Sequence, residues 1–347
     1  MTATTASTIA PSKRLRIVIP GGSGHLGRML AQHFHSQGHG VTVIARTPVG
    51  GPWRVAAWNG HGLDRWVNEL EGADVVINLA GRSVDCRYIR MNKREILNSR
   101  ILPTRILGQA IGGLKTPPKL WMNASTATIY RHALDRDMDE ETGEYGRCEL
   151  DAPRAWGFSV DVAEQWEDEF FRAKTPGTRK VALRSAMVMS AESGAFPALL
   201  RLVRMGLGGA AGSGRQFMSW VHEADFVRAV EHLIARENMD DVVNVAAPSP
   251  LPNQDFMAML REAWGRRFGL DLSERMLEFG AVFLWTETEL ILKSRRVVPA
   301  RLLHDGFQFA FPAWAAAARD LVDRCRNGCS RKTRTTPTGS ATTEFSH

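Results

Sequence analysis

A short glycine-rich segment near the N-terminus constrains the fold more than any other part of this 347-residue chain. Apolar residues at 17–19 form a strand-like run, glycines follow at 21, 24 and 27, and a helical pattern covers 27–37. Glycine here lets the backbone turn tightly, approach a pyrophosphate without an intervening Cβ, and pack the helix closely against the strand. The helix N-terminus adds free N–H groups and the positive end of its dipole. The segment therefore predicts the phosphate-binding loop of a dinucleotide site.

The chain after this loop alternates between strand-like and helix-like patterns. Strand-like runs occur at 41–45, 75–79, 120–124, 181–183 and 242–245, and a helix is predicted at 62–70. Unbroken Val and Ile runs between helices are typical of a parallel sheet covered on both faces. The sequence therefore predicts an α/β fold with a doubly wound parallel sheet.

A proline-rich break at 248–252 separates this pattern from helical segments at 255–264 and 284–292. We therefore expect a small, mainly helical C-terminal domain. The predicted organisation is a disordered leader at 1–14, a dinucleotide-binding domain at 15–248, a helical domain at 249–322 and a disordered basic tail at 323–347.

The net charge of +7 comes from the two ends of the chain, since residues 1–16 and 324–347 hold eight Lys and Arg against one Glu. The remaining body is near neutral and has no electrostatic footprint for nucleic acid. No apolar run approaches the roughly 20 residues that cross a bilayer. The N-terminus lacks the apolar core of a secretory signal, although its acid-free, Ser/Thr-rich composition is also compatible with a transit peptide. Four scattered cysteines suit reduced thiols, so we expect a cytoplasmic protein that binds no nucleic acid, membrane or metal.

The second predicted strand ends at Arg46, and this residue bears on the choice of cofactor. An acidic residue about 20 positions after the glycines would bind the ribose hydroxyls of NAD. A guanidinium can instead pair bidentately with a 2′-phosphate and stack on adenine, although exposed arginines at strand ends are also common. The pattern favours NADP(H). The residues expected to contact it are Gly21, Gly22, Ser23, Gly24, His25, Leu26, Gly27, Arg46, Leu79, Ala80, Gly81 and Ala124.

These motifs occur together in an order that resembles the extended short-chain dehydrogenase/reductase superfamily. More closely, the chain is similar to an atypical epimerase-like branch that carries a helical C-terminal domain of unknown function. The matching segments include PGGSGHLG, GADVVINLAG, NASTATIY, GSGRQFMSW and RRVVPARLLHDGFQF, and together the matches span roughly residues 16–312. The resemblance implies a Rossmann-type domain, NADP(H) binding and a cleft for a small-molecule substrate. Extended members are often dimers, which allows a homodimer here.

The superfamily's catalytic Tyr-x-x-x-Lys pair is absent from this chain. The resemblance places Trp156 and Val160 at its two positions, and neither side chain can transfer a proton. Ser125 matches the superfamily's catalytic hydroxyl, although a serine bonded to backbone at a strand end fits equally well. Tyr130 is a candidate substitute acid, with a packed aromatic residue as the alternative.

A polar segment after residue 213 supplies the candidate substrate contacts Arg215, Gln216, Ser219 and His222. Nucleotide-sugar enzymes of the superfamily often carry a diphosphate-binding arginine in this region. Met218 falls at its place, so Arg215 would have to act from a shifted position. His222 is also consistent with a structural role ahead of the next helix.

Two functional readings follow from these residues. The first is an NADP(H)-dependent, epimerase-like oxidoreductase that acts on a small sugar-like or carbonyl substrate. The second is a catalytically silent protein that binds or senses NADP(H). A scaffold that uses its C-terminal helices as a partner surface is a weaker third reading.

Overall fold

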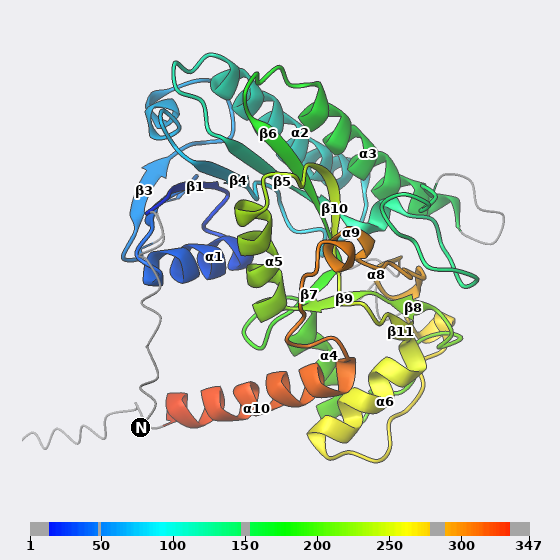
Figure 1. Ribbon diagram of the computed structural model, residues 1–347. Helices are drawn as coiled ribbons and strands as arrows, with labels where there is room; N and C mark the ends of the chain where they lie inside the picture. Colours follow the sequence, from blue (N-terminus) through cyan, green and yellow to red (C-terminus); the bar gives the residue numbers. More distant parts are fainter. Residues whose placement is uncertain (1–13, 48–49, 147–152, 278–288, 334–347) are drawn as a thin grey trace, which may run out of the picture.

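The centre of the molecule is a seven-stranded parallel sheet. The computed structural model describes residues 14–47, 50–146, 153–277 and 289–333 (Figure 1). The strands lie in the order β10-β6-β5-β4-β1-β2-β3. Their bounds are β1 Arg16–Pro20, β2 Gly40–Ala45, β3 Arg54–Ala57, β4 Val75–Asn78, β5 Leu120–Thr126, β6 Arg179–Ser185 and β10 Asp241–Val245. This arrangement confirms the predicted α/β fold.

Helices cover both faces of the sheet, as Figure 1 shows. Helices α1 (His25–Ser36) and α5 (Glu223–Ala235) pack on one face, and α2 (Arg90–Gly112) and α3 (Gly157–Arg172) pack on the other. Within β1, Ile17 and Ile19 join the core beneath α1 and α5, whereas Val18 joins the core beneath α2 and α3. Both faces of each central strand are therefore apolar, which explains the unbroken Val and Ile runs.

A second core is built around Trp314 at the start of α10 (Trp314–Thr333). Its indole stacks on Phe256 at 3.9 Å between ring centroids and meets Trp220 and Phe196 edge-on at 5.0 and 6.3 Å. The contributing elements are β7 Met187–Met189, α4 Ala195–Arg204, β8 Phe217–Met218, β9 Trp220–His222, β11 Leu251–Pro252 and α6 Asn253–Trp264. The second unit therefore includes residues before 248, whereas the sequence analysis assigned all residues from 15 to 248 to the first domain.

Two local predictions need correction, the helix at 62–70 and the start of the disordered tail at 323. The helix predicted at 62–70 is a short 3₁₀ turn, η1 (Arg65–Glu69), and the edge strand β3 before it was not predicted. Helix α10 continues to Thr333, past residue 323 where the disordered tail was expected to begin. The described part of the predicted 284–292 helix is α8 (Glu289–Leu292), followed by α9 (Ala300–His304). The predicted leader up to residue 13 and the tail from 334 lie outside the described residues.

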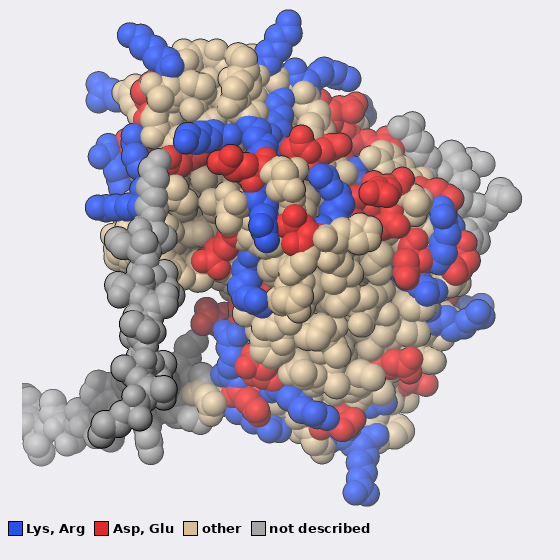
Figure 2. All heavy atoms as spheres, in the orientation of Figure 1, with Lys and Arg blue, Asp and Glu red and all other residues tan. Residues whose placement is uncertain are grey.

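Within the described ranges, no helix combines the length and apolar character that crossing a membrane requires. Figure 2 shows acidic and basic side chains mixed with one another around a broad tan area on one face. The same ranges contain no group of three or more His, Cys, Asp or Glu side chains arranged to hold a metal ion.

Candidate active site

A pocket of about 890 Å³ lies where β1, β2 and β4 end. It brings together seven of the predicted cofactor residues, namely Gly21, Ser23, Gly24, Arg46, Leu79, Ala80 and Gly81. Ligands of doubly wound sheets bind in a crevice at the carboxyl ends of the strands, and this pocket has that location.

The three glycines of the loop have different roles. Gly21 has φ +77°, and a Cβ there would lie 2.5 Å from the backbone nitrogen of Ala80. A Cβ on Gly27 would lie 2.4 Å from the Cα of Gly22. Because Gly21 and Gly27 have no Cβ, the loop can pack directly against the backbone of Ala80 and the helix can pack against Gly22. Gly24 is different, because the nearest atom to its Cβ would be the Gly21 carbonyl oxygen at 3.6 Å, and the residue lines the pocket.

Helix α1 begins at this loop without a side-chain cap, because Gly24 is its N-cap residue and has no side chain to bond the first turn. The N–H groups of that turn are therefore available to an anion. A Cβ-free, donor-rich cradle at the end of β1 fits the pyrophosphate of a dinucleotide.

The Arg46 end of the pocket is suited to negative charge. Arg46 is exposed, and Asn59 and His61 line the pocket beside it. Among the described residues that line the pocket, Glu95 is the one acidic side chain, and it pairs with Arg82. No carboxylate is therefore placed to bind ribose hydroxyls in the way that NAD-preferring sites use, and the arrangement fits a 2′-phosphate.

Sequence reasoning missed the residues that follow β3 and those that α2 contributes. The additional lining residues include Trp58, Asn59, Gly60, His61, Arg82, Ser83, Met91, Arg94, Asn98, Ser99, Leu102 and Pro103. Positions 58–61 could not be found because β3 itself has a weak pattern, RVAA. The α2 residues carry no local signal, since only the packing of α2 beside β4 brings them to the pocket.

Five predicted cofactor residues do not line this pocket. Gly22 and Gly27 are buried behind the loop, and Leu26 packs against the core beneath α1. His25 Nε2 faces Glu223 Oε2 at 3.9 Å, and Ala124 is half-buried in β5. Their contribution is to the shape of the loop and the sheet rather than to the pocket wall.

The Ser125 side chain is buried and is not among the residues that line the pocket. Its hydroxyl donates to Glu167 Oε1 at 2.5 Å, and Arg184 pairs with the same carboxylate at 2.6 Å. All three side chains are buried between β5, α3 and β6. The structure thus favours the alternative role of Ser125, a hydroxyl satisfied inside the protein, although its partner is a carboxylate rather than backbone.

Tyr130 belongs to the same buried network. Its side chain is 1 % exposed, its hydroxyl donates to Asn244 Oδ1 at 3.0 Å, and it accepts from Arg184 Nη1 at 2.9 Å. Burial raises the pKa of Tyr130 to about 12, which opposes loss of its proton near neutral pH. Burial lowers the pKa of Arg184, but its bonds to Glu167 and Tyr130 raise it above the usual value. Tyr130 therefore fits the packed aromatic residue that was the alternative to a substitute acid.

A hydroxyl pair at the end of β5 escaped the sequence analysis. The Thr126 hydroxyl donates to Thr128 Oγ1 at 3.1 Å, and Arg295 Nε donates to the same oxygen at 3.3 Å. Lys293 Nζ also donates to the Thr128 carbonyl at 3.0 Å. Successive side chains of a strand point to opposite faces, so Thr126 is directed away from the Ser125 network. The segment NASTATIY carries hydroxyls at 125, 126 and 128, and this alternation was the signal that could have separated them.

The positions expected for the catalytic pair hold Trp156 and Val160. Val160 is buried, and the half-buried Trp156 packs against the His132 ring with centroids 5.6 Å apart. Between them, Ser159 donates to Glu289 Oε2 at 2.7 Å. The first turn of α3 therefore offers no Tyr and Lys pair, and the C-terminal segment supplies polar side chains to this region.

The four predicted substrate contacts do not form one polar cluster. Arg215 is exposed, whereas Gln216 donates to the Ala211 carbonyl at 2.8 Å and Ser219 donates to the Arg295 carbonyl at 2.6 Å. His222 is buried, and its Nε2 lies 3.1 Å from Asp320 Oδ2. This contact fits a structural histidine, which was the alternative interpretation of His222. Burial lowers the pKa of His222 despite this carboxylate. Ser219 and His222 instead bond to the C-terminal segment, through Arg295 and Asp320.

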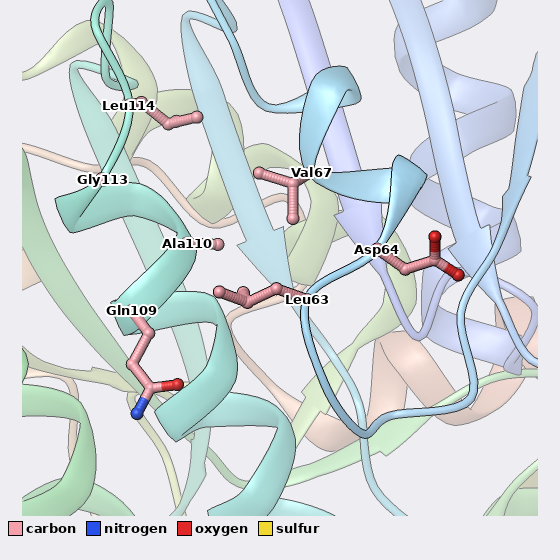
Figure 3. Close-up of a pocket in the computed structure, with 7 residues that line it drawn as sticks. All are labelled: Leu63, Asp64, Val67, Gln109, Ala110, Gly113 and Leu114. Atoms are coloured by element: carbon pink, nitrogen blue, oxygen red, sulfur yellow. The ribbon is translucent and has the colours of Figure 1, made fainter.

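A second, smaller pocket of about 340 Å³ lies between η1 and the end of α2. Figure 3 shows Leu63 pointing from the loop before η1 toward Ala110 of α2. Its one charged lining side chain, Asp64, accepts a hydrogen bond from the backbone N–H of Arg65 at 2.7 Å. A shallow apolar hollow with a carboxylate does not suit a dinucleotide.

A parallel sheet wound on both faces, with a glycine-lined pocket at its carboxyl edge, defines a Rossmann-like α/β protein. The chain belongs to the NAD-dependent epimerase/dehydratase family, whose model matches residues 17–246. A second family model, a domain of unknown function called DUF1731, matches residues 279–321. These two matches confirm the resemblance that the sequence motifs indicated.

Individual relatives support the same assignment. Human epimerase family protein SDR39U1 is 32% identical over 315 residues, covering 89% of this chain and all of the relative. Epimerase family protein SSP1921 from Staphylococcus saprophyticus is 30% identical, covering 88% and 98%. The crystal structure of human SDR39U1 (isoform 2) with NADPH superposes with a TM-score of 0.78 at 29% identity, covering 89% of this chain and 99% of that one. UDP-N-acetylglucosamine 4-epimerase from Bacillus cereus shares the fold, with a TM-score of 0.68 at 17% identity over 90% and 99% of the two chains.

Proposed function

We propose that this protein binds NADP(H) and is an epimerase-like oxidoreductase for a small sugar-like or carbonyl substrate. The observation that carries the proposal is the pocket itself, in which a Cβ-free cradle and an uncapped helix end lie beside Arg46. The human relative crystallised with NADPH supports the same choice of cofactor.

Each end of the pocket has a distinct task in this proposal. The first turn of α1 holds the pyrophosphate through backbone N–H groups, and Arg46 pairs with the 2′-phosphate. Leu79, Ala80 and Gly81 at the end of β4 form the wall along which the cofactor passes toward β5. When bound, NADP(H) supplies or accepts a hydride.

The test is a fluorescence titration of the purified protein with NADPH and with NADH. Arg46→Ala should weaken NADPH binding by about 1–3 kcal/mol, or roughly 5- to 150-fold, and leave NADH binding unchanged. Arg28→Ala is the matched control, because Arg28 is exposed on α1 but does not line the pocket. Failure of the wild-type protein to bind either cofactor would reject the proposal, and equal losses for the two arginine variants would reject the role of Arg46.

A catalytically silent NADP(H) sensor is the second candidate function, and the presence of Trp156 and Val160 at the catalytic positions favours it. Turnover of NADPH with a panel of small aldehydes, ketones and sugars separates the two candidates. We further propose a cytoplasmic protein that acts on a small molecule without nucleic acid or membrane. A homodimer, allowed by the superfamily resemblance, would appear as twice the chain mass in light scattering.

A further inference from the structure

Helix α2 extends beyond the strand that it follows. Because β4 and β5 are parallel neighbours, the helix between them runs antiparallel to both, so its N-terminal residues lie outward from the carboxyl edge of the sheet. After β4, the Arg82 N–H donates to Ser99 Oγ at 3.1 Å, and Arg100 Nη2 donates to the Arg82 carbonyl at 3.1 Å. Residues 90–98 precede this contact and, at 1.5 Å per residue, extend about 14 Å past it.

One face of this overhang lines the cofactor pocket. The residues of α2 that do so are Met91, Arg94, Glu95, Asn98, Ser99, Leu102 and Pro103. They follow one another at alternating steps of three and one, which is the spacing of a single helix face. Arg82 lines the same pocket from the segment after β4. We call the charged part of this surface, Arg82, Arg94 and Glu95, the α2 wall.

The two arginines of the α2 wall differ in their partners. Arg82 is ion-paired with Glu95, and the same nitrogen, Nη1, donates to Asn92 Oδ1 at 3.4 Å. A guanidinium has five N–H donors, so Nε and Nη2 of Arg82 remain for a ligand. Arg94 is exposed and forms no hydrogen bond or ion pair with any residue that the structure describes. The wall therefore presents two guanidinium groups against one carboxylate.

Arg82 lies close to the phosphate-binding loop, because β4 is the neighbour of β1. A Cβ on Gly21 would lie 2.5 Å from the Ala80 nitrogen, so the loop touches the segment that ends β4. Consecutive Cα atoms are about 3.8 Å apart, so the Arg82 Cα lies within about 8 Å of the Ala80 Cα. Arg46 follows β2, on the other side of β1. The α2 wall therefore lies on the diphosphate side of the pocket, and Arg46 on the 2′-phosphate side.

The charge of NADP(H) calls for more positive groups than the loop and Arg46 supply. Its diphosphate and 2′-phosphate together carry about three and a half to four negative charges near pH 7. Arg46 contributes one positive charge, and the N-terminus of α1 contributes about half of one. The α2 wall adds a net single positive charge, since Glu95 offsets one of its two arginines. The wall therefore supplies positive charge that the cofactor needs.

We propose that Arg82 and Arg94 bind the diphosphate of the cofactor from the side opposite helix α1. This inference rests on the proposed function and deepens it, because it assigns diphosphate contacts outside the glycine loop. Glu95 orients the Arg82 side chain, while Ser99 and Arg100 hold its backbone. Arg94 reaches the same phosphates from the overhang of α2. Guanidinium groups bind phosphate oxygens through paired, charge-assisted hydrogen bonds, which suits two neighbouring phosphates.

Titrations with NADPH and NADH test this assignment, because both contain the diphosphate and only NADPH has the 2′-phosphate. Arg82→Gln and Arg94→Gln should each weaken both cofactors by the same factor, about 3- to 30-fold. Neither should change the inhibition constant of 2′-AMP, which lacks the diphosphate, in competition with NADPH. Arg46→Ala should give the opposite pattern, with losses for NADPH and 2′-AMP and none for NADH.

Arg90→Gln is the matched control, because Arg90 is an exposed arginine of the same helix that does not line the pocket. At 0.15 M salt the screening length is about 8 Å, so Arg90→Gln should bind both cofactors as the wild type does. Arg94→Lys should recover part of the affinity that Arg94→Gln loses, because it keeps the charge. All these side chains are at least partly exposed, so the Tm of each variant should match the wild type.

Three results would overturn the proposal. They are wild-type affinity for both cofactors in Arg82→Gln or Arg94→Gln, losses confined to NADPH and 2′-AMP, and an equal loss in Arg90→Gln. The second result would move the two arginines to the 2′-phosphate, and the third would reduce their effect to overall charge. A wild type that binds neither cofactor would instead reject the proposed function, so the two failures are distinct.

Discussion

Substitution of the loop glycines should separate folding from cofactor binding. In Gly27→Ala, the new methyl group would lie 2.4, 2.7 and 2.8 Å from the Cα, carbonyl carbon and carbonyl oxygen of Gly22. These are backbone atoms, so the loop must move by several tenths of an ångström or more. Overpacking of this kind costs about 1–3 kcal/mol, and the better helix propensity of alanine returns about 1 kcal/mol. We therefore expect a net loss of up to about 2 kcal/mol in the free energy of unfolding.

Gly24→Ala should behave in the opposite way. Its methyl group would meet the Gly21 carbonyl oxygen at 3.6 Å, which is an ordinary contact. Alanine is a poorer N-cap than glycine, so the stability loss should stay near 0.5 kcal/mol. The methyl group would occupy space at the pocket, and NADPH binding should weaken at least about tenfold, or 1.4 kcal/mol.

Urea denaturation and NADPH titration of both variants check this prediction. Gly113→Ala is the matched control, because it places a methyl group 3.6 Å from two carbonyl oxygens after α2, away from the pocket. Wild-type stability in Gly27→Ala together with wild-type NADPH binding in Gly24→Ala would refute the assignment of different roles to the two glycines.

Two other side chains give sharp predictions. Arg184→Met should lower the free energy of unfolding by about 3–5 kcal/mol, because it leaves the buried Glu167 carboxylate unpaired. Adding Glu167→Leu should recover much of the loss in urea denaturation, and a double variant no more stable than the single one would contradict this account. Burial keeps His222 neutral in the folded protein, so the unfolded chain binds more protons below its usual pKa of about 6.5. Stability should therefore fall as the pH drops from 7 to about 5, and His222→Gln should show a shallower fall in Tm; parallel curves would contradict the role of His222.

The sheet could be predicted from the sequence because its signal is local. Each central strand is apolar on both faces, so Arg16–Pro20 and Val75–Asn78 stand out as apolar runs bounded by turns. The short edge strand Arg54–Ala57 pairs on one side only and carries two alanines, which is too weak a pattern. The continuation of α10 past 322 was missed for a related reason. The residues there are mostly polar, and their sequence resembles a disordered tail rather than a helix that continues.

The cofactor half of the candidate site could also be predicted, and the catalytic half could not. The loop glycines and Arg46 occupy fixed positions relative to one strand and one helix. Contacts such as Arg295 with Thr128 join residues 167 positions apart, and no local pattern predicts them. Ser125 was named because the resemblance matches it to the superfamily's catalytic hydroxyl, and the sequence did not reveal its buried partners Glu167 and Arg184, which lie 42 and 59 positions away.

The position of Trp314 at the centre of the second core has a consequence for folding during synthesis. Its partners on α4 and α6 emerge from the ribosome well before it, and Phe196 precedes it by about 120 residues. At translation rates of about 5–20 residues per second, α4 waits roughly 6–24 s before that indole is made. The seven strands of the main sheet are complete by then, since β10 ends at Val245. For the roughly 70 residues between Val245 and Trp314, or about 3–14 s at these rates, a nascent chain therefore carries a complete main sheet beside an exposed apolar flank, and chaperones can bind the flank in that time.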